Sequence, residues 1–392
     1  MKEIKPKVYA VGAVDWNRRL FDELIPLPDG TSYNSYLIKG SEKTALLDAV
    51  DPPMTGVLVN NLLKAGANQI DYLVAHHAEQ DHSGGITEIL LLHPETKVVT
   101  NPKCKAMLID LLEIDEDRFL CVEDGQTLSL GDKTLQFLYT PWVHWPETMS
   151  TYLQEDKILF SCDFFGSHLA STDVFVEDEG LVYEAAKRYY AEIMMPFRGP
   201  IKKDLEKIAP LDIDLIAPSH GPVYQKPEFI INAYKDWVSD DVKNEVVLAY
   251  VSMHESTKRM AEHFVDALAD RGIKVRQFNL TVTDIGKLAI ALVDAATVVI
   301  GSPTVLTGAH PLAAYAAFLA NALRPKTRFA SIIGSYGWGG KMADQLAAMM
   351  PFFKVEMLEP VIAKGLPSDD DYNALDRLAD DILDKHKEAA IA

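Results

Sequence analysis

The stretch HHAEQDHSGG, residues His76–Gly85, places four potential metal ligands within six positions, at His77, Glu79, Asp81 and His82. It directly follows the apolar run Tyr72–Ala75, which predicts a buried strand. The stretch therefore begins at the carboxyl end of a strand, where α/β proteins bind their ligands. Alternate side chains of an extended segment point the same way, so His77, Glu79 and Asp81 share one direction. The turn that follows brings His82 round, and the pattern predicts a metal site on an α/β fold.

Three further candidate ligands lie at the ends of later apolar runs: His144, Asp163 and His220. The complete set then holds four imidazoles and three carboxylates. Mixed nitrogen and oxygen ligands with open positions suit a non-haem di-iron centre that handles small gases. Asp163 is the natural bridge between the two metals.

This ligand pattern resembles the metallo-β-lactamase fold, whose hydrolases carry H-x-H-x-D-H followed by His, Asp and His. The resemblance implies an αβ/βα sandwich for the N-terminal part of the chain. Glu79 stands where those hydrolases have their second histidine. A carboxylate is a harder ligand than an imidazole, so this difference shifts the preferred metal from zinc toward iron or manganese.

The pattern H-x-E-x-D-H is similar to that of the flavodiiron proteins. The resemblance implies that His77, Glu79 and His144 bind one iron. It implies that Asp81, His82 and His220 bind a second iron and that Asp163 bridges the two. Some members of the family leave the residue that matches His82 off the metal, so both roles stay open for His82.

Four other side chains near these ligands have structural interpretations. We expect His76 to be a loop residue and His168 to be a structural histidine that orients a ligand or the substrate. Cys162 reads as a small buried side chain. The resemblance implies a tyrosine near the gas pocket, from Tyr189 or Tyr190, although both also suit helix packing.

From about residue 245 onward, strand-like runs alternate with helix-like runs. The expected strands are Glu245–Val251, Lys274–Asn279, Thr297–Gly301, Arg328–Gly334 and Phe353–Val361. Such an alternation predicts a doubly wound, five-stranded parallel sheet. We therefore expect two domains, residues 1–244 with the metal ligands and residues 245–392 with the parallel sheet.

Three loops at strand ends of the second domain predict a phosphate and flavin site. The first, Tyr250–Lys258, brings hydroxyls to the start of a helix, whose free amides bind anions, although such residues also merely cap helices. Gly301–Gly308 and Gly334–Gly340 offer close backbone approach and aromatic faces for stacking. All three resemble the FMN-binding loops of flavodoxin-like domains. The residues expected at FMN are Ser252, Met253, His254, Ser256, Thr257, Pro303, Thr304, Val305, Leu306, Thr307, Gly308, Ser335, Tyr336, Gly337, Trp338, Gly339 and Gly340.

The order of the two domains resembles the flavodiiron core over nearly the whole chain. The resemblance implies an oxidoreductase that reduces O2 to water, or NO to N2O, at a di-iron site fed by FMN. It implies rubredoxin, reduced by an NAD(P)H-dependent reductase, as the electron donor. It also implies a head-to-tail homodimer, or a tetramer, in which FMN of one chain faces the metals of the other.

Composition excludes several other classes. The 392 residues carry 38 Lys and Arg against 57 Asp and Glu, and a net charge of −19 disfavours nucleic acid as a partner. Three cysteines without a C-x-x-C pair disfavour a zinc ribbon, an iron–sulfur cluster and a redox dithiol. No run of 18 apolar residues occurs and the N-terminus has no apolar signal segment, so we expect a cytoplasmic protein without a membrane partner.

Two alternatives belong to other functional classes. A zinc hydrolase with an accessory flavodoxin-like domain would use the same N-terminal fold to activate water, but Glu79 and the attached flavin domain argue against it. A flavodoxin-type electron carrier would have no use for seven assembled ligands. Iron content separates both alternatives from the main interpretation.

Overall fold

The computed structural model describes residues 1–392, and the chain divides into two compact units. The first unit comprises Met1–Tyr190 and Phe197–Val238, and the second comprises Ala191–Pro196 and Ser239–Ala392. The predicted domain boundary at Asn244 falls at the start of a strand that begins at Lys243. None of the helices combines the length and the apolar character that crossing a bilayer requires.

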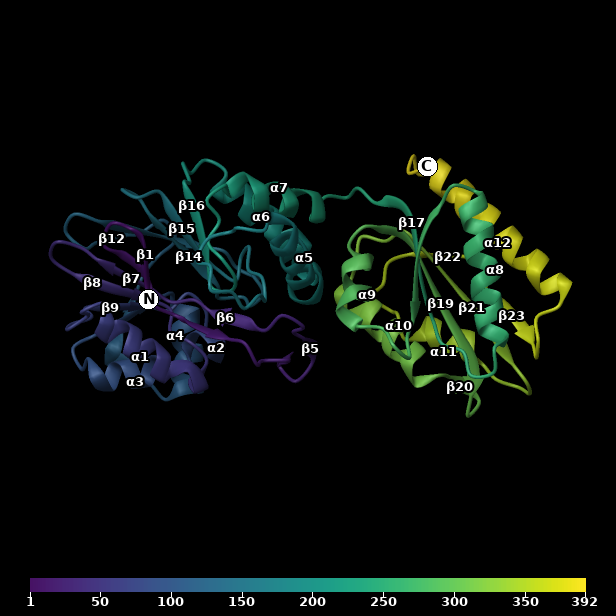
Figure 1. Ribbon diagram of the computed structural model, residues 1–392, viewed down its shortest axis with the longest axis horizontal. Helices are drawn as coiled ribbons and strands as arrows, with labels where there is room; N and C mark the ends of the chain where they lie inside the picture. Colours follow the sequence, from purple (N-terminus) through teal and green to yellow (C-terminus); the bar gives the residue numbers. More distant parts are fainter. The chain divides into compact units, whose positions relative to one another are not determined.

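Two sheets face each other in the first unit (Figure 1). The larger has the order β1 (Lys2–Lys5), β2 (Val8–Ala10), β7 (Tyr36–Lys39), β8 (Thr44–Leu47), β9 (Tyr72–Val74), β10 (Lys97–Thr100), β11 (Phe119–Cys121). The smaller has the order β12 (Thr127–Ser129), β13 (Thr134–Tyr139), β14 (Met149–Leu153), β15 (Ile158–Cys162), β16 (Leu215–Pro218). A core of buried side chains that includes Leu47, Val74, Phe137 and Phe160 joins the two sheets.

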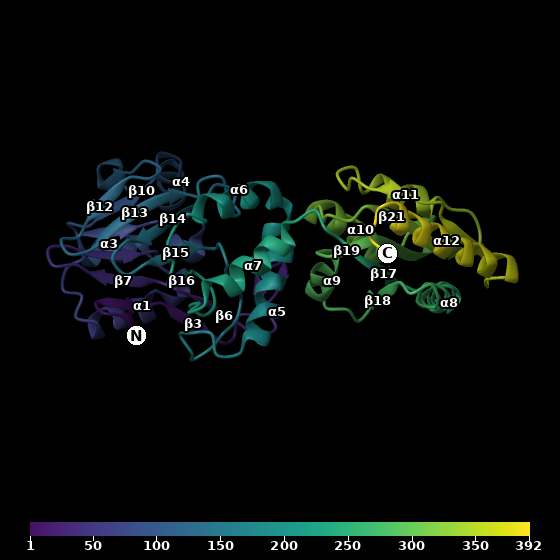
Figure 2. The same cartoon turned by 90° about the horizontal axis from the view of Figure 1, so that it is seen from above.

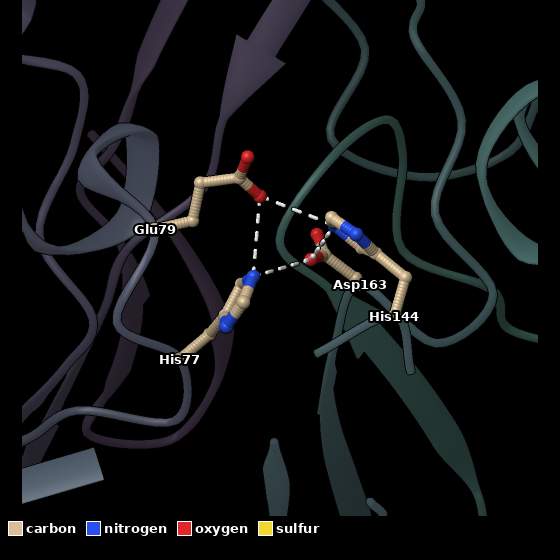
Figure 3. A group of neighbouring side chains, drawn as sticks. All are labelled: His77, Glu79, His144 and Asp163. Carbon is tan, nitrogen blue, oxygen red and sulfur yellow. Dashed lines mark hydrogen bonds and ion pairs between the residues drawn. The ribbon is translucent and has the colours of Figure 1, made fainter. Parts of the chain in front are cut away.

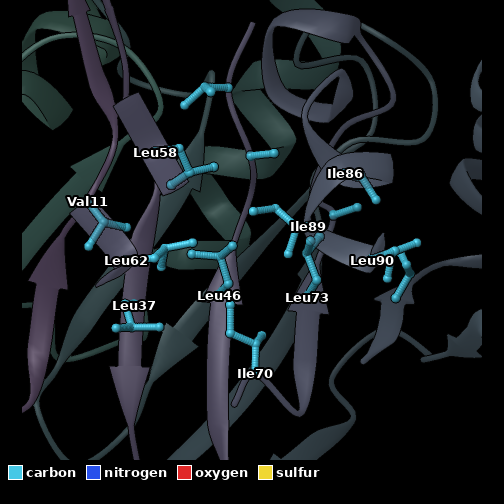
Figure 4. Packing of buried hydrophobic residues seen from close by; sticks show 14 of the residues in the cluster. Val11, Leu37, Leu46, Leu58, Leu62, Ile70, Leu73, Ile86, Ile89 and Leu90 are labelled. Carbon is cyan, nitrogen blue, oxygen red and sulfur yellow. The ribbon is translucent and has the colours of Figure 1, made fainter. Parts of the chain in front are cut away.

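Helices cover the outer faces of this sandwich. A second core, with Leu46, Leu58, Leu73 and Ile89, joins the larger sheet to its helices (Figure 4). These helices are α1 (Thr55–Lys64), α3 (Ile86–Leu92) and α4 (Pro102–Leu112). Along the smaller sheet lie α5 (Glu179–Tyr189), α6 (Arg198–Ile208) and α7 (Pro227–Trp237), as both views show (Figures 1 and 2). The predicted αβ/βα sandwich is confirmed.

Two short strand pairs and one helical turn complete the first unit. The pairs are β3 (Ala13–Asp15) with β6 (Thr31–Tyr33), and β4 (Leu20–Phe21) with β5 (Ile25–Pro26). The short helix α2 (Gln80–Ser83) follows β9 and carries two of the predicted ligands.

The second unit is a doubly wound parallel sheet, as predicted. Its strands follow the order β18 (Lys274–Asn279), β17 (Lys243–Tyr250), β19 (Ala295–Val305), β21 (Phe329–Tyr336), and β21 pairs on its far side with β22 (Glu356–Met357) and β23 (Val361–Lys364). One face carries α8 (Ser256–Asp270) and α12 (Asp369–Glu388), and the other carries α9 (Ile285–Leu292), α10 (Pro311–Leu323) and α11 (Met342–Ala348). In chain order the strands run 2-1-3-4-5, the flavodoxin order.

The fifth strand and the third differ from the prediction. Where a single strand was expected over Phe353–Val361, the fifth position holds the separate segments β22 and β23. Pro360 lies between them, and a proline has no N–H to give to a ladder. The third strand continues past Gly301 to Val305 and pairs there with the short β20 (Gly308–Ala309).

Candidate metal centre

Every ligand predicted from the sequence lies in a segment that follows a strand of the sandwich. His77 and Glu79 follow β9, and Asp81 and His82 lie in α2. His144, Asp163 and His220 follow β13, β15 and β16. The seven side chains form two adjoining groups in which the potential ligand atoms lie within 4.8 Å of one another.

The first group, called the first metal position below, consists of His77, Glu79, His144 and Asp163 (Figure 3). The Nε2 atoms of His77 and His144 lie 3.2 and 3.1 Å from Oε2 of Glu79. The same two nitrogens lie 3.7 and 3.4 Å from Oδ2 of Asp163. Two imidazoles and two carboxylates thus converge on one point.

The second group, called the second metal position, consists of Asp81, His82 and His220. Nε2 of His82 lies 3.0 Å from Oδ1 of Asp163, and Nε2 of His220 lies 3.4 Å from the same oxygen. Nε2 of His220 also lies 3.1 Å from Oδ2 of Asp81. Because Oδ2 of Asp163 faces the first position and Oδ1 faces the second, Asp163 has the geometry of a bridge.

In two of the imidazoles, Nδ1, the ring nitrogen that points away from the other ligands, makes a hydrogen bond that orients the ring. Nδ1 of His77 donates to Oε1 of Glu147 over 2.7 Å, and Nδ1 of His220 donates to the backbone oxygen of Ser32 over 2.6 Å. A carboxylate and a carbonyl only accept, so Nδ1 carries the proton in both rings. Nε2 is therefore the atom that each ring directs at the centre.

The centre is buried and short of hydrogen-bond partners. Asp163 and His77 are fully buried, and Asp81 and His220 almost so. Both carboxylate oxygens of Asp81 and of Asp163, and Nε2 of His82, have no hydrogen-bond partner. Buried polar atoms without partners are costly, and a cation placed among them would remove that cost.

The charges of the centre support the same conclusion. Burial alone would raise the pKa of Asp163, but the surrounding imidazoles, His82 first, hold that pKa well below its usual range. Burial would lower the pKa of His220, yet the nearby carboxylates of Asp163 and Asp81 raise it to about 10. Protons on the imidazoles therefore balance the carboxylates, and a metal ion would replace those protons.

The neighbouring side chains fall outside the two groups. His76 is buried, and its Nδ1 and Nε2 lie 2.6 Å from Asp48 and 2.7 Å from Thr151. Both ring nitrogens are therefore engaged in hydrogen bonds within the fold, and neither faces the centre. The His168 ring lies 4.8 Å from the rings of both His220 and Tyr189. Tyr190 instead donates its hydroxyl to the backbone of Trp237.

Cys162 comes closest to being an additional ligand, since its sulfur lies with His82 and Asp163 in one potential group. Burial raises the pKa of its thiol well above the usual range. Metals bind the thiolate, so the protonated Cys162 is a poor ligand beside the carboxylates.

Sequence reasoning missed Glu147, whose side chain is buried behind His77. Burial would raise its pKa, but the hydrogen bond from His77 and its charge keep it below the usual range. The available signal was an acidic residue in the aromatic segment Pro141–Thr148, three positions after His144.

In the second unit, the predicted loops enclose a cavity of about 240 Å³. Its lining includes Ser252, Met253, His254, Ser256, Thr257, Pro303, Thr304, Ser335, Tyr336 and Gly337. Gly339 and Gly340 line an adjoining cavity of about 330 Å³ that shares Thr304 and Tyr336 with the first. The cavities lie at the carboxyl ends of β17, β19 and β21, where flavodoxin-order sheets bind their ligands.

The remaining predicted flavin residues lie next to this cavity. Val305, Leu306, Thr307 and Gly308 form the hairpin turn between β19 and β20. Leu306 and Thr307 both have positive φ, and the Leu306 side chain is 91% exposed. Trp338 is 73% exposed. These large apolar surfaces are uncovered in the single chain.

Comparisons with known proteins agree with this architecture. Residues 31–221 match the family model described as ODP family beta lactamase. A nitric oxide reductase of Moorella thermoacetica is 36% identical over 358 residues, covering 90% of each chain. A coenzyme F420H(2) oxidase of Methanothermobacter marburgensis is 33% identical, covering 86% of this chain and 87% of that protein. The structure of rubredoxin oxygen:oxidoreductase from Desulfovibrio gigas superposes with a TM-score of 0.96 at 30% identity, covering 100% of both chains.

Fold and site together define a flavoprotein oxidoreductase built from a metallo-β-lactamase-like unit and a flavodoxin-like unit. The similarity extends over nearly the full length of relatives in both comparisons. The chain belongs to the flavodiiron protein family.

Proposed function

We propose that this chain reduces O2 to water, or NO to N2O, at a pair of iron ions, with electrons that arrive through FMN. The observation that carries the proposal is the placement of Asp163, whose two oxygens face two separate groups of ligands. A zinc hydrolase needs no flavin unit, and an electron carrier needs no seven-ligand centre.

The ligand chemistry supports iron. We propose His77, Glu79 and His144 for the first position, Asp81, His82 and His220 for the second, and Asp163 between them. Nε2 of His82 is only 3.0 Å from Oδ1 of Asp163, which supports a direct role for His82. Histidine with carboxylate is the ligand mixture of non-haem iron. When bound, the pair of ferrous ions would supply two electrons, one from each iron, and reduced FMN would supply two more.

Two of the protein's own aromatic side chains lie beside this centre. Tyr189 is buried, and both its burial and the charge of Asp163 raise the pKa of its hydroxyl well above the usual range. That hydroxyl therefore keeps its proton and is able to donate to negative charge that develops beside Asp163. Phe21 is buried, its ring lies 5.0 Å from that of His168 and 6.3 Å from that of His220, and it helps to keep water from this side of the centre.

Three features of the second unit support FMN. Ser252 Oγ is buried without a hydrogen-bond partner and lines the cavity. The N-terminus of α8 has no side-chain cap, so its amides remain available to a phosphate. Tyr336 and Trp338 supply aromatic faces for an isoalloxazine ring.

Glu255 immediately precedes α8 and, as a carboxylate near a phosphate, is expected to face solvent. It is exposed and pairs with Lys258 over 3.0 Å. Its φ of 70° is strained for a residue with a side chain. We expect Glu255→Gly to bind FMN as tightly as the wild type or up to about fivefold tighter, because a repelling charge is lost.

Titration of flavin-depleted protein with FMN, followed by flavin fluorescence, measures this effect. Glu262→Gln is the matched control, since Glu262 approaches the same lysine from the next turn of α8. A large loss of FMN affinity in Glu255→Gly would show that the carboxylate supports the site.

The partners of the reaction follow from the family. The relative from D. gigas is named for rubredoxin and the one from M. marburgensis for coenzyme F420H(2). We propose rubredoxin, kept reduced by an NAD(P)H-dependent reductase, as the donor. We also propose a head-to-tail homodimer, or a tetramer built from it, in which FMN of one chain serves the metals of the other.

Native mass spectrometry of protein produced with iron tests the cofactor set directly. We expect a dimer with about two irons and one FMN per chain, which consumes O2 or NO when a reductant is supplied. Zinc without flavin would support the hydrolase alternative. Flavin without any metal would support the electron carrier.

A further inference from the structure

Glu147 lies behind the first metal position, on the side of His77 that faces away from the centre. Its side chain is fully buried. Oε1 accepts hydrogen bonds from Nδ1 of His77 over 2.7 Å and from the backbone N–H of Ala78 over 3.0 Å. A single carboxylate oxygen thus fixes both the ring of His77 and the backbone that follows it.

The position of Glu147 is itself fixed by the fold. Its backbone oxygen accepts a hydrogen bond from Nδ2 of Asn101 over 2.5 Å. Asn101 in turn caps α4 by accepting from the N–H groups of Lys103 and Cys104. The segment Pro141–Thr148 therefore delivers His144 to the first position and Glu147 to the back of His77, so one loop holds this position from two sides.

The second metal position is supported differently. The far nitrogen of His220 donates to the backbone oxygen of Ser32, which is a neutral acceptor. A carboxylate behind an imidazole makes the metal-facing nitrogen a stronger donor than a carbonyl does. The His77–Glu147 pair and the His220–Ser32 pair are both buried. Solvent therefore screens the negative charge of Glu147 poorly. The two positions therefore differ in how well they stabilise a higher positive charge.

We propose that Glu147 makes the two metal positions inequivalent: it acts as a positioning residue that fixes His77 and holds an iron at the first position at a lower reduction potential than an iron at the second. This inference rests on the proposed di-iron function. The iron held by His77, Glu79 and His144 is then the first to give up its electron, and the iron held by Asp81, His82 and His220 is the second.

The substitution Glu147→Gln tests this role, because glutamine has nearly the same shape and its amide oxygen still accepts from His77 and Ala78. Only the charge is removed. We expect the first oxidation of the iron pair to lose about tenfold in its equilibrium constant, which corresponds to a rise of about 59 mV in potential. The second oxidation should change less, so the separation between the two potentials narrows.

A mediated redox titration followed by EPR of the half-oxidised state measures both potentials in the FMN-containing protein. Asp204→Asn, measured above pH 8 because burial raises the pKa of Asp204 to about 7, is the control, since Asp204 is another buried carboxylate, on α6 and outside the two ligand groups. Its potentials should equal those of the wild type. Glu147→Asp keeps the charge but shortens the side chain, and we expect an intermediate shift.

The outcomes separate the two levels of the proposal. A wild-type protein that binds no pair of irons overturns the proposed function. A wild-type protein with two irons but no separation between their potentials overturns the role of Glu147 alone. The role of Glu147 is also overturned if Glu147→Gln retains two irons and FMN and leaves both potentials unchanged. If the glutamine variant does not fold, the same result in Glu147→Asp overturns it.

Discussion

Replacement of Asp163 by asparagine is expected to abolish gas consumption while FMN stays bound. The two oxygens of Asp163 face different groups, at 3.0 Å from His82 and 3.4 Å from His144. Asparagine replaces one of these oxygens by an NH2 group that cannot bind a cation. We expect the iron content to fall from two to one or none per chain and the turnover to fall by about 100-fold or more.

The measurement combines metal and flavin analysis with an O2 or NO electrode. Because the proposed FMN site lies in the other unit, the FMN content should stay at the wild-type value, which would show that this unit of the variant is folded. Cys162→Ser is the matched control in the adjacent position, and we expect it to retain both irons and activity. Undiminished turnover in Asp163→Asn would overturn the assignment of the centre.

The cluster of potential metal ligands was predictable from the sequence because each of these residues follows an apolar run. Such runs form buried strands, and the segments after β9, β15 and β16 then meet on one side of the sandwich. Asp163 was expected to bridge the two groups because a carboxylate has two oxygens. In the structure, its Oδ1 faces His82 and its Oδ2 faces His144.

Glu147 could not be found in this way, because its role depends on the path of one irregular loop. No periodicity places an acidic residue behind His77, and a glutamate in a loop is usually solvated. His76 was expected to be a loop residue outside the ligand set, but the partners of its ring could not be predicted. It sits beside His77 in the sequence, yet Asp48 and Thr151 hold its ring away from the centre.

In the second unit, the alternation of strands and helices predicted the doubly wound parallel sheet but not the details of its strands. Pro360 divides the fifth strand, and the third strand runs on into a hairpin. That hairpin carries Leu306 and Thr307 as its exposed turn, whereas Thr304 lines the cavity. Turn geometry of this kind depends on backbone angles that a hydrophobic pattern does not encode.

A complementation experiment is expected to recover activity from two inactive chains, and it decides which FMN serves which metals. The first chain is Asp163→Asn, which keeps FMN. The second is Ser256→Asp, where a carboxylate at the first residue of α8 repels the phosphate of FMN and at the same time favours the helix. Each homodimer should be inactive, since one lacks the metal pair and the other lacks flavin.

In a purified heterodimer of these two chains, the only intact FMN and the only intact metal pair belong to different subunits. If electrons cross between subunits, the heterodimer keeps one working pair of the two and should show about half of the wild-type turnover. If each FMN serves its own chain, the heterodimer has no working pair and should stay inactive. Differently tagged chains, purified in tandem and supplied with the same reductant, allow the comparison. Because the head-to-tail arrangement predicts recovery and the intrachain arrangement predicts none, the result depends on the direction of electron transfer and not on the stability of either variant.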